Sequence, residues 1–447
     1  MTAGPAVDIA YYAGVTDEEF ATWTSVAERV AAELAETALA RDRANQNPVA
    51  ELRLLREAGL LGFAAPRELG GGGGSLTQAL KLSRIVSAAD GSIGQLLTYH
   101  YSNGVWTHIL GTPEQRERIA RGVGTEGWFQ GSVSNPRDPG VTVERDGDGY
   151  RITGRRTFAT GVAVADLITV LLYGDEPVNV VIPPDRPGLS FGDDWDNLGQ
   201  RLTASGSVTF DGVVAHADEV LAGLGDGAAD RRRDGLRGLF SQLIFAHLYA
   251  GIADGALTAA ARYVREKGRP WPEAASRDVT EDPYHLQLLG RLSASLAAAT
   301  ALADAASEEF EAALALGADL TEERWGRLAI LIDQAKAVTT ETVLDVTHNI
   351  YQATGARSTA NAVGLDIYWR NARTHTTHDP LPYRQREIGR HVLTGELPRP
   401  RQFADLAKAA DVTQGAAADT ATGTTAATGT TAATGTTAAT GTEAVER

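Results

Sequence analysis

The chain has 447 residues and a formal net charge of −16, from 57 acidic and 41 basic side chains. This acidic balance disfavours nucleic acid and anionic membranes as partners. The chain contains no cysteine, which excludes disulfides, thiolate catalysis and cysteine zinc ligands and is compatible with the cytoplasm. Its first thirty residues lack a basic region followed by an apolar run, and we expect no stretch long enough to span a bilayer. These features predict a soluble cytoplasmic protein.

Hydrophobic periodicity predicts helices in the first part of the chain and strands in the middle. Residues 18–64 and 80–108 carry apolar side chains at helical spacing, separated by a glycine run at 70–74 that predicts a flexible loop. Between residues 128 and 218 apolar and polar residues alternate, and Asp-Gly-Asp-Gly at 146–149 is typical of a hairpin turn. The middle of the chain is therefore predicted to be a β domain.

Long segments with an apolar face follow, and they predict an antiparallel helix bundle. They cover residues 243–264, 284–316 and 322–350. The end of the chain repeats TAATGT without a large apolar side chain until Val445, which favours disorder over a β-solenoid. The predicted domains are an N-terminal helical domain (1–127), a middle β domain (128–228), a C-terminal bundle (229–413) and a disordered tail (414–447).

Titratable groups crowd together at residues 370–380, where His375 and His378 lie three residues apart. On a helix, these two imidazoles would share a face. Pro380 biases Asp379 away from helix, so His378 is expected where a helix gives way to a turn. A zinc site here lacks a convincing third ligand, so we expect no metal. The segment is the first candidate for chemistry.

The order of domains, together with two local motifs, resembles the acyl-CoA dehydrogenase superfamily of flavoproteins. The motifs are Pro-Arg-Glu-Leu-Gly-Gly at 66–71 and the segment from Leu198 to Phe210, which contains Gly-Gln-Arg-Leu-Thr-Ala-Ser. The resemblance implies an α+β fold with an N-terminal α-helical domain, a middle β-barrel domain and a C-terminal antiparallel helix bundle.

The resemblance aligns Asp379, followed by Pro380, with the catalytic glutamate of true dehydrogenases. A shorter carboxylate on a restricted backbone disfavours abstraction of a substrate α-proton. Residues 369–380 and 241–284 instead resemble the branch of flavin-dependent monooxygenases that oxygenate aromatic sulfur heterocycles. No dinucleotide fingerprint is present, so the reduced flavin would come from a separate NAD(P)H-dependent reductase.

The resemblance implies a two-component monooxygenase that uses O2 and reduced FMN and acts through a flavin C4a-hydroperoxide. The implied reaction converts dibenzothiophene to its sulfoxide and sulfone. N-hydroxylation of nitrogen compounds on the same scaffold is the alternative within oxygenases. A true acyl-CoA dehydrogenase and a catalytically silent flavin-binding oligomer are the alternatives from other classes.

The resemblance also implies three catalytic residues. His378 would stand beside the reactive edge of the flavin, because an imidazole can donate or accept near neutral pH. His375 would orient His378 or contact the substrate, and Tyr99 would hydrogen-bond the oxygenating species. One turn before Tyr99, the resembled enzymes carry a histidine where this chain has Gln95. Backbone-bonded histidines at a helix end and a half-buried helical tyrosine are the plain structural alternatives.

Flavin contacts are implied for the middle domain and for two arginines. An arginine fork suits a phosphate monoester, and a homotetramer would present the arginines from a neighbouring subunit. Thr354 replaces a glycine that lets the backbone approach the FAD pyrophosphate, which favours FMN over FAD. Each position alone also fits a hydroxyl-rich strand end or an exposed arginine. The implied cofactor-binding residues are Ser132, Ser134, Thr160, Trp195, Ser205, Arg269 and Arg357.

Overall fold

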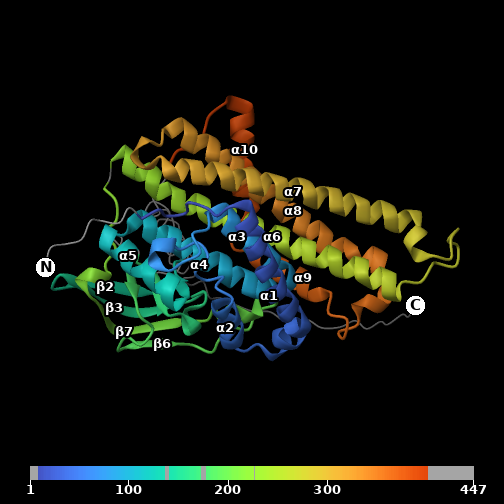
Figure 1. Ribbon diagram of the computed structural model, residues 1–447, viewed down its shortest axis with the longest axis horizontal. Coiled ribbons are helices and arrows are strands. Elements are labelled where there is room, and N and C mark those ends of the chain that lie inside the picture. Colours follow the sequence, from blue (N-terminus) through green and yellow to red (C-terminus); the bar gives the residue numbers. More distant parts are fainter. Residues whose placement is uncertain (1–8, 136–139, 173–177, 226, 401–447) are drawn as a thin grey trace, which may run out of the picture.

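Strands lie at one end of the molecule, and a long helical bundle extends away from them (Figure 1). The structure is a computed structural model that describes residues 9–135, 140–172, 178–225 and 227–400. The order of helices, strands and helices confirms the predicted α+β class. The repeat tail falls outside the described residues, so its predicted disorder stays a prediction.

The N-terminal domain is helical, as predicted, and local capping sets where its first helix begins and ends. The Thr16 hydroxyl accepts from the Glu19 N–H, and the Glu19 carboxylate accepts from the Thr16 N–H, which makes a capping box. The helix ends at Ala44, and the residue that caps it, Asn45, has a left-handed backbone. The helices are α1 (Asp17–Ala44), α2 (Val49–Glu57), α3 (Leu76–Ala89), α4 (Gly91–Leu110) and α5 (Pro113–Arg121).

Asp90 divides the segment predicted to be helical over 80–108 into α3 and α4. Its backbone is extended, and its carboxylate accepts from the N–H groups of Ser92 and Ile93 at the start of α4. Arg41 of α1 donates to the same carboxylate at 2.5 Å, so the buried charge is paired. The segment is helical as predicted, but it is interrupted at this position, and α4 takes a direction of its own.

The strands of the middle domain are divided between two sheets, so the predicted barrel is not one continuous sheet in the described residues. One sheet has the order β1-β4-β5, with β1 parallel to β4, and the other has the antiparallel order β2-β3-β7-β6. The predicted turn at 146–149 joins β2 to β3. Side chains from both sheets enter one apolar core. The strands are β1 (Gln130–Val133), β2 (Val141–Asp146), β3 (Gly149–Arg156), β4 (Leu167–Leu172), β5 (Val178–Ile182), β6 (Leu189–Phe191) and β7 (Val208–Ala215).

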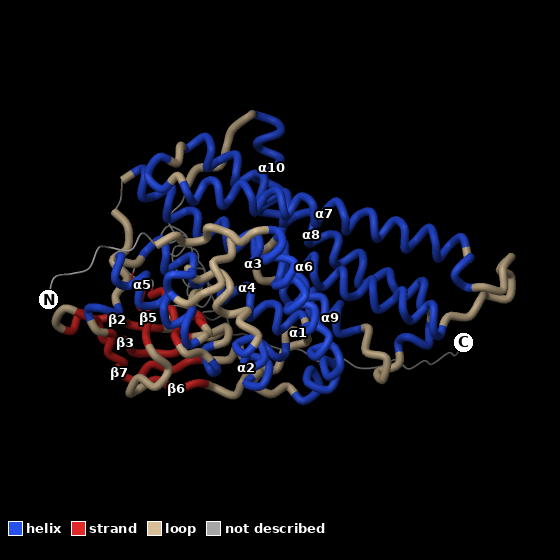
Figure 2. The backbone as a smooth tube through the Cα atoms, viewed as in Figure 1, coloured by secondary structure: helices blue, strands red, loops and turns tan. Residues whose placement is uncertain are grey.

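The C-terminal bundle is built around α6, which packs against α3, α4, α7, α8 and α9 (Figure 2). The apolar faces predicted from the sequence are buried at Leu292 and Leu296 of α7 and at Leu328 and Ile332 of α8. The helices are α6 (Ala228–Lys267), α7 (Pro283–Ala315), α8 (Glu322–Thr354), α9 (Asp366–His375) and α10 (Leu381–Thr394).

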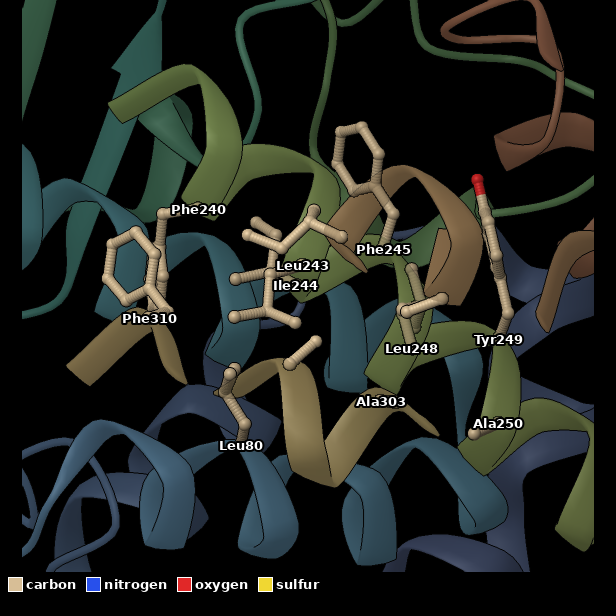
Figure 3. Close-up of a cluster of buried hydrophobic side chains, with 14 of the residues drawn as sticks. Leu80, Phe240, Leu243, Ile244, Phe245, Leu248, Tyr249, Ala250, Ala303 and Phe310 are labelled. Carbon is tan, nitrogen blue, oxygen red and sulfur yellow. The ribbon is translucent and has the colours of Figure 1, made fainter. Parts of the chain in front are cut away.

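Figure 3 shows the core where α6 meets α7 and α3. The rings of Phe240 and Phe310 lie 4.8 Å apart, and Leu80 and Ala303 pack beside them. By length and composition, α6 and α7 could each cross a membrane, so the expectation that no stretch is long enough is wrong on that criterion. The most apolar window of α6 is 78% buried inside the fold, as in a core helix, whereas that of α7 is only 22% buried.

The glycine run at 70–74 is ordered by backbone contacts, although its composition predicts a flexible loop. The N–H of Gly73 donates to the Ala65 carbonyl at 2.9 Å. A Cβ at Gly71 would lie 2.2 Å from the same carbonyl oxygen. The run is therefore needed because two backbone segments approach too closely for a side chain.

We expect Gly71→Ala to lower the free energy of unfolding by about 1–3 kcal/mol, because the added methyl group overlaps the Ala65 backbone. Gly389→Ala is the control. A Cβ there meets nothing within 4 Å, and α10 should gain about 1 kcal/mol from the better helix former. Urea unfolding at a fixed protein concentration measures both changes. Equal stability of Gly71→Ala and the unaltered protein would contradict the expectation.

Candidate active site

His375, the last residue of α9, lies between two tyrosine hydroxyl groups. Its Nε2 is 3.1 Å from the hydroxyl of Tyr99 on α4, and its Nδ1 is 2.9 Å from the hydroxyl of Tyr249 on α6. The residue is 4% exposed, and the Phe245 ring packs against the imidazole with centroids 4.7 Å apart. Phe245 and Tyr249 project from α6, one turn apart (Figure 3). Three helices that are distant in the sequence thus meet at one imidazole.

Burial keeps all three groups of this cluster neutral. It lowers the pKa of His375 well below its usual value, and the nearby His378 and Lys336 act in the same direction. Burial also raises the pKa of Tyr99 and that of Tyr249. The cluster therefore supplies hydrogen bonds near pH 7 and does not supply a net charge.

His378 lies in the turn that follows α9, where the sequence predicts it. Its side chain is exposed, and its ring stacks on His375 with centroids 5.7 Å apart and planes 9° from parallel. The centroid of its ring also lies 5.2 Å from that of the Phe245 ring. The three residues predicted to be catalytic are thus close together, but the hydrogen bond to Tyr99 comes from His375. The place of His378 beside a flavin stays a prediction.

Tyr249 is a residue of this cluster that the sequence analysis missed. It lies within the apolar run of α6, and its position there is typical of a core residue. Both nitrogens of His375 have tyrosine partners, so neither faces a second metal ligand. Within the described ranges, no group of three or more His, Cys, Asp and Glu side chains is placed to hold a metal ion.

Three of the predicted flavin contacts come together in the middle domain. The Ser205 hydroxyl donates to the Thr160 hydroxyl at 3.0 Å, and the Ser132 N–H donates to the Thr160 carbonyl at 3.1 Å. All three residues are buried. Ser134, one residue beyond β1, is half-buried. The segments before β7, after β3 and along β1 therefore bring several polar groups to one place.

Trp195, another predicted flavin contact, lies beside an aromatic residue that the sequence analysis did not single out. The rings of Trp195 and Phe158 are 5.8 Å apart, edge to face. Phe158 has φ +55° and is 57% exposed, an unusual backbone for a bulky residue. In the sequence, only its position two residues before Thr160 could have pointed to Phe158 as a site residue. The fold holds an aromatic surface open next to the hydroxyl groups, which suits a planar ligand.

Gln95, Gln130 and Gln200 are buried, and each carries an amide atom that has no hydrogen-bond partner among the described residues. Gln95 lies one turn before Tyr99 on α4, and its Oε1 is unpartnered. Gln200 has φ +54°, both of its amide atoms are unpartnered, and its N–H donates to Asn371 of α9 at 2.7 Å. Buried polar atoms without partners cost free energy unless a ligand satisfies them. An isoalloxazine, whose edge carries carbonyl oxygens and an N–H, fits such groups.

The two predicted phosphate ligands lie apart from this cluster. Arg269 follows α6, Arg357 follows α8, and both are exposed. Neither makes an ion pair or side-chain hydrogen bond within the described part of the chain. Lys267, the last residue of α6, lies about 27 Å along the helix axis from Tyr249. Arg269, which follows Lys267, therefore lies far from the His375 cluster of the same chain.

Comparison with known proteins decides the family. Models of the N-terminal, middle and C-terminal acyl-CoA dehydrogenase domains match residues 16–126, 125–213 and 243–381. Dibenzothiophene monooxygenase from Rhodococcus erythropolis is 35% identical over 393 residues, which cover 84% of this chain and 94% of that enzyme. The chain belongs to the acyl-CoA dehydrogenase superfamily, in its monooxygenase branch.

Other members of this branch agree in length and structure. The probable FMNH2-dependent monooxygenase SfnC of Pseudomonas putida is 32% identical over 384 residues, which cover 85% of this chain and 97% of SfnC. The crystal structure of TdsC from Paenibacillus sp. A11-2 with FMN and indole has a TM-score of 0.81 and 36% identity, and it covers 86% of this chain and 99% of TdsC. The superfamily fold therefore extends over nearly all of the described chain.

Asp379, which the sequence resemblance aligns with the dehydrogenase base, is held in an ion pair. The Lys336 ammonium group lies 2.6 Å from its carboxylate, and Arg384 lies 3.2 Å from it. Burial acts to raise the pKa of Asp379, but Lys336 and Arg384 outweigh burial and hold that pKa below its usual value. A carboxylate with a lowered pKa and two cationic partners is a poor base. Both the short side chain of Asp379 and its ion pairs therefore disfavour dehydrogenation.

We expect Asp379→Asn to lower the free energy of unfolding by about 3–5 kcal/mol at pH 7, because Lys336 is 2% exposed and would lose its counter-ion. The folded-state pKa of Asp379 is lowered, so this stabilisation is complete above the unfolded value of about 3.9 and disappears as the pH falls through the folded-state pKa. Urea unfolding at several pH values measures it.

Asp345→Asn is the matched control, because its partner Arg291 is half exposed and the pair is worth about 0–1 kcal/mol. If the two substitutions lower the free energy of unfolding by the same amount at pH 7, Asp379 does not balance a buried charge.

Proposed function

We propose that this protein is the oxygenase of a two-component system. It takes reduced FMN from a separate NAD(P)H-dependent flavin reductase and uses O2 to oxygenate the sulfur of an aromatic heterocycle such as dibenzothiophene. The observation that carries the proposal is the cluster of Tyr99, His375 and Tyr249, a set of neutral hydrogen-bonding groups held in a buried place. The names of the related monooxygenases support the same chemistry.

The residues of this chain would hold FMN and control its surroundings. When bound, reduced FMN supplies the electrons that activate O2 for transfer of one oxygen atom. The hydroxyl groups of Ser132, Thr160 and Ser205 and the aromatic surface of Trp195 would line the ring system. Tyr99 would donate a hydrogen bond to the reacting oxygen. A neutral donor can hold that oxygen without giving up its proton, which limits wasteful release of hydrogen peroxide.

N-oxygenation of a nitrogen heterocycle is the second candidate, and Gln95 favours it. The Oε1 atom of Gln95 is buried and unpartnered one turn from Tyr99. Such an acceptor suits a substrate with an N–H group, whereas dibenzothiophene has no hydrogen to donate. Substrates of the two kinds therefore belong in the same assay.

We also propose that the protein works as a cytoplasmic homotetramer. The open side of α7 carries small residues at helical spacing, and Ala297, Ala301 and Ala305 are exposed there. Helices that present such a side can pack closely against a second copy. Arg269 and Arg357 are exposed and unpaired, as residues that bind the phosphate of a neighbour's FMN would be in one isolated chain.

We expect the protein, supplied with FMN, NADH, a flavin reductase and dibenzothiophene, to form a product heavier by one or two oxygen atoms. Tyr99→Phe should lower the product formed per NADH by about 100-fold and raise hydrogen peroxide, because one preorganised donor is lost. Mass spectrometry and peroxide assay measure both. Indole tested in parallel distinguishes nitrogen heterocycles from sulfur heterocycles. Hydrogen peroxide as the sole product with both compounds would refute the proposal.

We expect Arg269→Ala and Arg357→Ala each to weaken FMN binding by about 10- to 100-fold, the size of a hydrogen bond to a charged group. Riboflavin binding should not change, because riboflavin has no phosphate. Arg277→Ala is the control, since Arg277 is exposed in the same loop as Arg269. Fluorescence titration gives the affinities. If FMN and riboflavin lose affinity equally, the arginines do not bind the phosphate.

A further inference from the structure

The Tyr249 hydroxyl faces two acceptors on His375 but has a single proton to give. It lies 2.9 Å from Nδ1 of the imidazole and 3.3 Å from the backbone carbonyl oxygen of the same residue. The carbonyl oxygen already accepts from the His378 N–H at 3.0 Å. Tyr249 is about 1% exposed, so water cannot readily take the place of either partner. The shorter distance and the occupied carbonyl both favour donation to Nδ1.

Donation to Nδ1 determines the rest of the hydrogen-bond chain. A neutral imidazole carries one proton, so an Nδ1 that accepts leaves Nε2 protonated. Nε2 lies 3.1 Å from the Tyr99 hydroxyl oxygen and would donate to it. The Tyr99 hydroxyl then keeps its own proton for another partner, and Tyr99 is the partly exposed member of the cluster. In the opposite arrangement, Nδ1–H would donate to the Tyr249 hydroxyl oxygen, and the Tyr99 hydroxyl would donate its only proton to Nε2.

We propose that Tyr249 is a positioning residue that holds His375 as the Nε2–H tautomer, so that the Tyr99 hydroxyl is free to donate to a ligand. This inference deepens the proposed function and rests on it for the identity of the ligand. Tyr249 touches neither cofactor nor substrate in this account. It acts through His375, which it holds from the side opposite Tyr99.

The two histidines therefore have different roles. His375 is hydrogen-bonded through both ring nitrogens, so the tautomer set by Tyr249 determines whether Nε2 donates to Tyr99. His378 stacks on the face of the His375 ring. A substitution of Tyr249 should therefore change the direction of hydrogen bonds more than the shape of the site. Tyr249→Phe removes the hydroxyl and keeps the ring in the core.

Solid-state ¹⁵N NMR of histidine-labelled protein tests the tautomer without any turnover. The chain has nine histidines, and the His375→Gln variant identifies the signals of His375. We expect a protonated Nε2 and an unprotonated Nδ1 in the unaltered protein, and a shift toward a mixture of tautomers in Tyr249→Phe. A protonated Nδ1 in the unaltered protein, or His375 signals that do not change in Tyr249→Phe, would overturn the proposal.

Turnover provides the second readout. Tyr249→Phe should lower the oxygenated product formed per NADH by about 3- to 10-fold, the size of one neutral hydrogen bond, and leave the KM for the substrate unchanged. In a Tyr99→Phe background it should have no further effect, because the donor that it positions is gone. Equal losses in both backgrounds would contradict a role through Tyr99.

Tyr101→Phe is the matched control, since the Tyr101 hydroxyl is also buried and donates to a backbone carbonyl outside the cluster. It should leave both the His375 signals and the product per NADH unchanged. Failure of the proposed function and failure of this inference are distinguishable. An unaltered protein that makes only hydrogen peroxide refutes the function, while the NMR signals still decide the role of Tyr249.

Discussion

The structure depends on keeping one buried imidazole neutral and bonded at both nitrogens. His375 ends α9, and its partners stand on α4 and α6. An imidazole left without these partners would place an unpaired polar group in the interior, which costs more free energy than a neutral hydrogen bond returns. The three helices must therefore meet at this point. The break at Asp90 contributes, because it allows α4 to start in its own direction toward the bundle.

A second constraint is the charge next to this cluster. Lys336 is buried, and Asp379 and Arg384 surround it in a network that extends to Asp333. Burial raises the pKa of Asp333 to about 6, although Arg384 and Lys336 oppose the change. The Asp379 carboxylate thus serves as the counter-ion of a buried ammonium group within the superfamily fold.

Much of the fold could be predicted, because periodicity and capping are local properties of a sequence. The helices of the bundle, the hairpin at 146–149 and the turn at His378 follow from such signals. Tyr249 could not be found in this way, since a tyrosine in an apolar run looks like a core residue. The left-handed backbones of Phe158 and Gln200 have no sequence signature in residues other than glycine. The glycine run was predicted to be flexible but is ordered, because composition does not reveal a close approach of two backbone segments.

The sequence by itself determined the order of helices and strands, the absence of thiol chemistry and the one segment where titratable groups crowd together. It also placed His375, His378 and Tyr99 among the candidates. Only the tertiary structure decided that His375 is the histidine bonded to Tyr99, that Tyr249 completes the cluster and that Asp379 is paired with Lys336. The physical reason is distance along the chain. Hydrogen bonds and ion pairs between helices are set by how those helices pack, and no local pattern records that packing.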